Sequence, residues 1–188
     1  AAIFSKKWRD VLPGHGQCNP ERLPVDRTVR GRILVIDACT PTPDRDSGSM
    51  DTFQFMRIFK SLGLHVTFVP ENLAHVGRYT RDLQRIGVET LHAPFFMSFE
   101  TLLEKLGGSY DLVLLYRAPV AAKLIKLVRR HAPQAKVIFD TVDLHFLREE
   151  REAELTGNPQ KAKMAARNRK IELDMIVSAD ATIVLSNH

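Results

Sequence analysis

Short apolar runs alternate with segments of helical periodicity over most of this chain. The apolar runs are rich in β-branched and aliphatic residues and have the length of strands; they cover residues 33–36, 64–69, 88–91, 112–116, 136–140 and 181–185. The segments between them repeat apolar residues every three or four positions and cover residues 50–62, 78–86, 98–106, 118–131 and 146–178. Such an alternation indicates parallel strands joined by right-handed crossovers. The sequence therefore predicts an α/β fold, namely a Rossmann-like parallel sheet with helices on both faces.

Glycine and proline punctuate two of these units in the same way. Gly63 ends the first long helix and Pro70 closes the strand after it, and Gly87 and Pro94 repeat this spacing. A helix–turn–strand unit is thus expected twice in succession. Within the long helical region near the carboxyl end, a break is expected at residues 157–159, which read Gly-Asn-Pro.

Residues 1–31 differ from the rest of the chain. The first dozen residues fit one short amphipathic helix, ended by Pro13 and Gly14, and residues 16–31 are polar, proline-containing and basic. We expect residues 1–31 to be a linker or the end of a preceding domain, and residues 32–188 to form the α/β domain. A disordered tail is the alternative for the first segment.

The composition is that of a folded globular chain. Of its 188 residues, 44% are hydrophobic and 26% are charged, which suits one domain or one domain with an extension. No apolar run approaches the ~20 residues of a membrane span. Two cysteines fit a reducing compartment, and they lack the clustering with histidines that a zinc site shows. The net charge of +5 permits attraction to anionic partners, but aromatic residues make up only 7% and do not interleave with basic ones, so nucleic acid is not an expected partner.

The connection between the first strand and the first long helix is one candidate site. Asp37 begins a loop with two prolines that ends in Ser47, Gly48 and Ser49, and Ser49 is the expected N-cap of the helix. A glycine-bearing loop that leads into a helix N-terminus offers backbone N–H groups to an anion, and phosphate is the usual anion. The loop carries neither the dinucleotide nor the P-loop fingerprint, so an ordinary β–α connection is an equal alternative.

The tip of the fifth strand carries a second group of polar residues. Asp140 ends this strand, and Asp143 and His145 follow in the turn before a charged helix start. In such sheets ligands bind at the carboxyl ends of the strands, where Arg117, after the fourth strand, also lies. A turn of this kind does not by itself require two aspartates and a histidine, so these residues are candidates for a functional site. The alternatives are that an aspartate caps the helix and that the histidine is structural.

By their order and spacing, several pieces of the chain resemble the amino-terminal half of family 4 glycosyltransferases, the retaining enzymes of GT-B fold. The pieces are residues 32–37 (RILVID), 41–49 (PTPDRDSGS), 140–145 (DTVDLH) with 148–151 (REER), and 179–186 (ADATIVLS). The resemblance covers residues 32–188. It is closest to bacterial enzymes that build surface polysaccharide or lipopolysaccharide O-antigen chains.

The resemblance implies half of a two-domain enzyme. The GT-B fold has two facing Rossmann-like domains, of which the first mainly holds the acceptor and the second holds the nucleotide-sugar donor. The expected activity is that of a hexosyltransferase that transfers a sugar from a nucleotide-sugar to a growing polysaccharide or lipid-linked glycan. Neither a cofactor nor a metal is implied, because basic side chains and helix dipoles usually neutralise the leaving diphosphate in this fold.

The resemblance also implies roles for particular side chains. The expected donor-phosphate-binding residues are Ser47, Gly48 and Ser49. The expected catalytic residues are His145 and Asp143: the histidine matches one that lies near the transferred sugar, and the aspartate would orient it or meet the acceptor hydroxyl. The expected acceptor-binding residues are Asp140 and Arg117.

The chain departs from the family at its carboxyl end. It stops at residues 186–188, where the family crosses to the donor domain, and it contains no Glu-x7-Glu pair, the family's donor-side signature. The resemblance therefore implies that the donor domain is absent and that this polypeptide is inactive alone. Two other classes of protein stay open: a non-catalytic nucleotide- or phosphate-binding module that uses the same helix N-terminus, and a flavodoxin-like interaction domain in which Asp37 and Asp140 are merely acidic strand tips.

A basic face is expected on the helix at residues 118–131. Lys123, Lys126, Arg129 and Arg130 lie roughly on one side of it, away from the apolar residues that face the sheet. We expect a cytoplasmic protein, and this face predicts peripheral contact with an anionic inner membrane leaflet, where a lipid-linked acceptor is presented. An ordinary solvated basic surface is the alternative.

Overall fold

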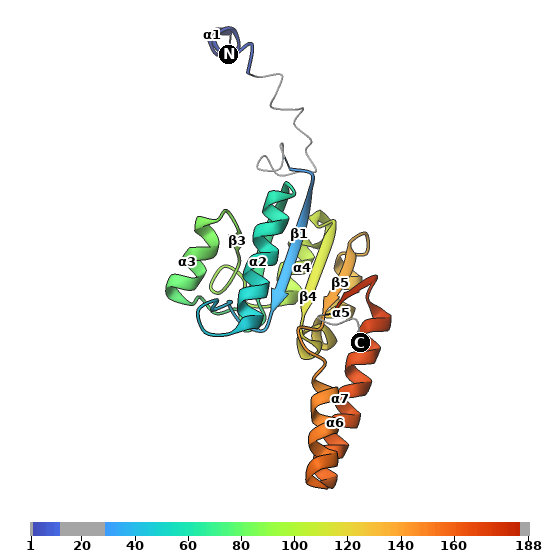
Figure 1. Cartoon of the computed structure of the whole chain (residues 1–188). Helices are drawn as coiled ribbons and strands as arrows, with labels where there is room; N and C mark the ends of the chain where they lie inside the picture. Colours follow the sequence, from blue (N-terminus) through green and yellow to red (C-terminus); the bar gives the residue numbers. More distant parts are fainter. Residues whose placement is uncertain (1, 12–28, 185–188) are drawn as a thin grey trace.

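The computed structural model describes residues 2–11 and 29–184, and within these ranges it contains a six-stranded sheet whose paired strands are all parallel (Figure 1). The strands are β1 (Gly31–Asp37), β2 (Leu64–Pro70), β3 (Glu89–Thr90), β4 (Leu112–Tyr116), β5 (Lys136–Asp140) and β6 (Ala181–Ile183). Their order in the sheet is β3-β2-β1-β4-β5-β6, which is that of a doubly wound, Rossmann-like fold. The predicted fold class is confirmed.

The described residues form the helices α1 (Ala2–Lys7), α2 (Ser47–Ser61), α3 (Gly77–Arg85), α4 (Phe99–Leu106), α5 (Ala118–His131), α6 (His145–Thr156) and α7 (Pro159–Ser178), with a 3-10 turn at Gly107–Ser109. Both faces of the sheet are covered by helices. The helices α2 and α3 pack on one face, and α4, α5 and α7 pack on the other. Central strands of such a sheet are covered on both sides, which explains why the apolar runs of the sequence are continuous and do not alternate with polar residues.

The side chains of β1 divide the hydrophobic core into two layers. Ile33 and Val35 point to the layer that contains Met56 of α2. Leu34 and Ile36 point to the opposite layer, which α4, α5 and α7 complete. Every residue of β1 is buried, so the strand that carries the first candidate site is anchored from both sides.

The predicted strand boundaries lie within two residues of those in the structure. β4 and β5 begin and end at the predicted residues. β3 contains only Glu89 and Thr90 of the predicted strand at residues 88–91, and it pairs with β2 alone. The N–H group of Leu91 makes one more hydrogen bond to the carbonyl oxygen of Phe68, at 3.0 Å, and the chain then leaves the sheet. The described part of β6 ends at Ile183, before the predicted end at residue 185, which lies outside the described ranges.

The predicted N-cap of α2, Ser49, is wrong. The helix begins at Ser47, and Asp46 caps it: its backbone is extended, and its Oδ1 accepts the Ser49 N–H at 2.8 Å. Aspartate and serine are equally good N-caps, so the pattern Asp46-x-x-Ser49 offered two candidates. The apolar periodicity begins only at Met50 and therefore did not define the first turn.

The helices α6 and α7 form a hairpin that extends past the carboxyl edge of the sheet (Figure 1). The break between them falls where the sequence predicts it. Gly157 ends α6 with a left-handed φ of 60°, and the side chain of Asn158 caps α7 by accepting the Gln160 N–H at 2.9 Å. Pro159 then begins α7. At this first position the backbone N–H has no partner within the helix, so proline, which lacks the N–H, loses no hydrogen bond there.

The amino-terminal segment is only partly described. The helix α1 and a turn that reaches Val11 agree with a short helix at the start of the chain. Leu12 and residues 13–28 lie outside the described ranges, so the linker at residues 1–31 stays a prediction. Among the helices that the structure describes, none combines the length and the apolar character needed to cross a membrane.

Candidate functional site

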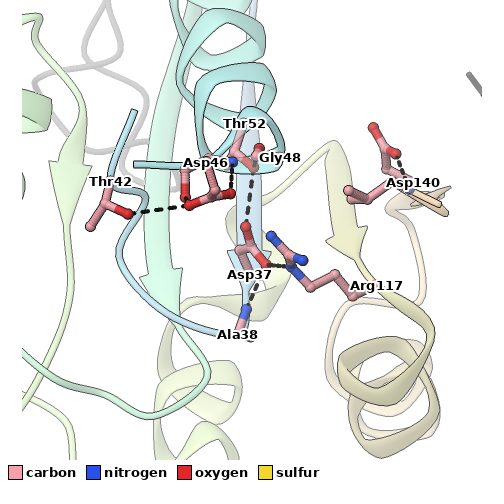
Figure 2. Close-up of polar contacts among 10 residues, drawn as sticks. Asp37, Ala38, Thr42, Asp46, Gly48, Thr52, Arg117 and Asp140 are labelled. Atoms are coloured by element: carbon pink, nitrogen blue, oxygen red, sulfur yellow. Dashed lines mark hydrogen bonds and ion pairs between the residues drawn. The ribbon is translucent and has the colours of Figure 1, made fainter. Parts of the chain in front are cut away.

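The order of the strands opens a crevice at one edge of the sheet. β1 leads into α2 on one face and its neighbour β4 leads into α5 on the other, so the two connections diverge. In doubly wound sheets ligands bind at this switch point, outside the carboxyl ends of the strands. Asp37 ends β1 and Arg117 follows β4, and Figure 2 shows the Arg117 side chain reaching to Asp37 across the crevice.

Asp37 and Arg117 form the ion pair at the centre of this crevice. Arg117 Nε donates to Asp37 Oδ1 at 2.8 Å, and the Ala38 N–H donates to the same oxygen at 2.7 Å. The second oxygen of Asp37 accepts from Thr52 Oγ1 at 3.1 Å, so a carboxylate that is 2% exposed has a partner on both sides. Burial opposes the charge of Arg117, but Asp37, Asp46 and Cys39 together outweigh it and raise the pKa of the guanidinium. Arg117 therefore stays charged.

Two residues in the crevice hold a backbone conformation that is unusual for side chains other than glycine. Arg117 has a φ of 67° and Val142 a φ of 57°, each of which costs on the order of 1–3 kcal/mol. Asp140 holds both turns: its carbonyl oxygen accepts the Arg117 N–H at 2.9 Å, and its Oδ1 accepts the Val142 N–H at 2.8 Å. Strained residues of this kind cluster at ligand sites, which makes this edge of the sheet the leading candidate.

Asp140 lies in the wall of the crevice and is only 3% exposed. Burial raises the pKa of its carboxyl group, while the Val142 N–H acts in the opposite direction. One oxygen of the carboxyl group is already used to shape the turn. The binding of the acceptor substrate by Asp140 stays a prediction.

A carboxylate occupies the N-terminus of α2. The Ser49 hydroxyl donates to Asp46 Oδ2 at 2.6 Å, and this bond together with the Ser49 N–H lowers the pKa of Asp46. Thr42 Oγ1 donates to the same carboxylate at 3.3 Å. Of the three residues predicted to bind phosphate, Ser47 is exposed and Gly48 and Ser49 are buried, and Ser49 already bonds to Asp46.

Gly48 lies close to side chains from the two neighbouring loops. A Cβ atom at this position would come within 3.1 Å of both Arg117 Nη2 and Val142 Cγ1. Only glycine fits there without displacing one of these side chains. The β1–α2 loop therefore meets Arg117 and the β5–α6 turn at Gly48, whereas no such contact with Asp143 or His145 is observed among the described residues.

His145 begins α6, three residues after Val142, a stretch of chain that spans at most ~11 Å. Its Nδ1 lies 3.1 Å from Arg148 Nη2 and 3.6 Å from Asp143 Oδ2, and Arg148 Nη1 donates to the same Asp143 oxygen at 3.0 Å. A guanidinium only donates, so Nδ1 accepts from Arg148. The structure thus brings His145 and Asp143 together as predicted and adds Arg148 to them.

A buried carboxylate that the sequence analysis missed lies beneath His145. Glu172 of α7 is 2% exposed and lies close to the backbone N–H groups of Phe146 and His145, which favour its charged form, whereas its Oε2 has no partner within the part of the chain that the structure describes. Burial raises the pKa of Glu172 to about 7. The N-cap residue of α6, Leu144, is apolar and makes no side-chain cap hydrogen bond. The aspartate cap considered for this helix is not observed.

The predicted basic face on α5 is largely paired with acids. Three of its four cations contact carboxylates: Lys123 with Glu71 at 2.9 Å, Arg129 with Asp180 at 2.7 Å, and Arg130 with Glu100 at 3.7 Å. Such pairs reduce the positive field that an anionic surface would meet. Within residues 2–11 and 29–184, no group of three or more His, Cys, Asp or Glu side chains is arranged to hold a metal ion.

No family model and no curated protein matches this sequence. Among solved structures, the chain is similar to a protein of unknown function from Vibrio parahaemolyticus, VPA0982. The TM-score is 0.43 and the sequence identity 10%, over 84% of this chain and 94% of that chain.

Proposed function

We propose that this chain is the acceptor-side domain of a retaining glycosyltransferase of GT-B fold. The intact enzyme transfers a sugar from a nucleotide-sugar to a growing polysaccharide or lipid-linked glycan in the cytoplasm. The observation that carries the proposal is the meeting of three loops at the switch point of the sheet, where a Cβ on Gly48 would come within 3.1 Å of both Arg117 and Val142. The motifs that resemble the family occupy the first and third of these loops.

The sequence assigns Arg117 to acceptor binding; we propose instead that Arg117 supplies the cation for the donor diphosphate. Its Nε is bound to Asp37, which fixes the plane of the guanidinium, and its Nη2 lies on the side of Gly48. A planar guanidinium matches phosphate oxygens better than a point charge does. The N-terminus of α2 is a weaker choice, because Asp46 already fills it with a carboxylate. The same carboxylate argues against a plain phosphate-binding module.

His145 is assigned to the transferred sugar. Arg148 donates to its Nδ1 and is itself held by Asp143, so the other ring nitrogen is proposed to meet a sugar hydroxyl. A hydrogen bond at that position steadies the sugar as its transition state acquires oxocarbenium character. His145 is half-buried at the start of α6, so part of its ring is exposed.

The test is sugar transfer by the intact gene product, with a panel of labelled nucleotide-sugars and lipid-linked acceptors. His145→Ala is expected to lower turnover by roughly 100-fold or more, the scale of a lost proton-handling or positioning group. Arg151→Ala, an exposed change on the same helix, is the matched control and should leave turnover unchanged. Thermal unfolding of both variants confirms that they are folded. Full activity of His145→Ala, or no transfer by the wild type from any donor, refutes the proposal.

Peripheral contact with an anionic membrane leaflet is part of the same proposal. Lys126 and the partly neutralised cations of α5 supply a modest attraction that salt must weaken. We expect co-sedimentation with vesicles that contain phosphatidylglycerol at low salt and release at high salt. Charge reversal by Lys126→Glu should reduce the bound fraction. Equal binding to neutral vesicles leaves α5 as an ordinary solvated surface.

A further inference from the structure

The helix α1 and the turn after it carry an exposed apolar face. Its members are Ile3, Phe4, Trp8 and Val11, each at least 41% exposed, and they belong to neither layer of the hydrophobic core. Within residues 2–11 and 29–184 they are four of the fifteen exposed large hydrophobic side chains, so this short segment is much richer in them than the α/β domain. Single exposed apolar side chains are ordinary, but a group of them marks a contact surface.

Local hydrogen bonds gather these side chains on one side of the segment. The Trp8 N–H donates to the Phe4 carbonyl oxygen at 3.0 Å, which is the bond between successive turns of an α-helix and places the two side chains one above the other. Their ring centroids are 6.4 Å apart. The Val11 N–H donates to the Trp8 carbonyl oxygen at 3.0 Å, and this turn keeps Val11 beside Trp8.

The charges of the segment are cationic on balance. Lys6, Lys7 and Arg9 stand against a single acid, Asp10. Among the described residues none of these three cations pairs with a carboxylate, whereas three of the four cations of α5 do. An anionic surface therefore meets their full charge.

The position of Lys7 separates a lipid surface from a protein partner. Its Nζ lies 5.2 Å from the centroid of the Trp8 ring, so an ammonium group sits at the apolar face itself. A protein that covered this face, including a second copy of the chain, would have to bury that charge, which is costly. At a lipid surface the aliphatic stem of Lys7 lies along the ring while the ammonium group reaches the lipid phosphates.

We propose that residues 3–11 form an interfacial anchor for an anionic lipid leaflet. The apolar face enters the boundary between headgroups and acyl chains, and the three cations meet the phosphates. Tryptophan suits this boundary because its ring is apolar and its N–H is polar. Residues 2–11 span ~15 Å as a helix, which is too short for the ~30 Å hydrocarbon core, so the anchor lies in the plane of the membrane. It is separate from the contact through α5 and does not depend on transferase activity.

The experiment uses the fluorescence of Trp8, the only tryptophan of the chain. The 188-residue chain is titrated with vesicles of phosphatidylcholine and with vesicles of an equimolar mixture of phosphatidylcholine and phosphatidylglycerol. With the anionic vesicles we expect a blue shift, protection from acrylamide, and quenching by lipids brominated on the acyl chain, because interfacial helices lie ~5–10 Å deep. Neutral vesicles should bind roughly 20-fold more weakly, since each net positive charge contributes about fivefold. Added salt should narrow this difference.

Phe4→Ser tests the apolar face, and Phe95→Ser is its matched control. Phe95 is 73% exposed in the connection between β3 and α4, so the control makes the same change at an exposed phenylalanine elsewhere. Phe4→Ser should lower the affinity for vesicles about tenfold, and Phe95→Ser should leave it unchanged. The double variant Lys6→Gln with Arg9→Gln should lower the affinity for anionic vesicles alone. Urea unfolding shows that the α/β domain is folded in each variant.

The inference is overturned if neither kind of vesicle binds, or if the protein binds without a blue shift of Trp8, which leaves the contact to α5. Equal affinity of Phe4→Ser and the wild type overturns it as well. So does an emission maximum that depends on protein concentration without lipid, because the face then packs on a second copy. Insertion of Trp8 by a protein whose intact gene product transfers no sugar keeps the anchor and removes the transferase. Sugar transfer with Trp8 left in water does the reverse.

Discussion

Glu172 should make the stability of this domain depend on pH. Its carboxyl group is buried close to the first N–H groups of α6, which favour its charge, while the carboxylates of Glu149 and Asp143 disfavour it. Burial and these neighbours raise its pKa from 4.5 to about 7. Because the folded state binds the proton more tightly than the unfolded state, the stabilisation is fully present below about pH 4.5 and is lost as the pH rises through about 7. The difference between the two pKa values corresponds to at most ~3 kcal/mol.

Glu172→Gln isolates this effect, because glutamine keeps the shape and the accepting oxygen but cannot ionise. The measurement is the free energy of unfolding by urea at a series of pH values from about 5 to about 8. We expect the wild type to lose up to ~3 kcal/mol more than Glu172→Gln over this range. Glu154→Gln, exposed on α6, should parallel the wild type. Parallel profiles for Glu172→Gln and the wild type would refute the reasoning.

Three further predictions concern the packing of the fold, each measured by urea unfolding. A Cβ at Gly107 would lie 2.5 Å from the carbonyl oxygen of His131, so Gly107→Ala should cost ~1–3 kcal/mol, whereas Gly108→Ala, with no described atom within 4 Å of its Cβ, should be neutral. Met56→Ala removes a fully buried side chain and should lower the free energy of unfolding by ~2–5 kcal/mol. A loss below ~1 kcal/mol would mean that the surrounding core residues move in to fill the cavity. Ser98→Ala removes the N-cap of α4, which accepts a first-turn N–H at 3.2 Å, and should cost ~1 kcal/mol; an unchanged transition would show that water replaces it.

The fold could be predicted from the sequence because its signals are local. The change from continuous apolar runs to helical periodicity, with glycine at the helix ends, placed β4, β5 and α5 within a residue of their observed limits. Asp46 was missed as a cap because two capping residues compete within one turn, and the choice between them depends on how the loop packs.

The site depends on contacts between distant parts of the chain, and these carry no local signal. Asp37 and Arg117 are 80 residues apart, and nothing in the sequence selects this partner among the other arginines. Glu172 is one acid among several on a charged helix, and only the packing of α7 against α6 places it under His145. The sequence therefore located the edge of the sheet where the site lies, but not the pairs that hold it together.

The central position of β1 has a consequence for how the chain is made. One edge of β1 stays without a partner until β4 has been synthesised, because β4 pairs with that edge. The end of β1 at Asp37 and the start of β4 at Leu112 are 75 residues apart. At a synthesis rate of ~5–20 residues per second, β1 leaves the ribosome ~4–15 s before that partner is complete. During this interval a strand that is buried at every residue in the finished sheet offers an open edge to other nascent chains. Production of this domain should therefore depend on chaperones that hold hydrophobic strands during translation.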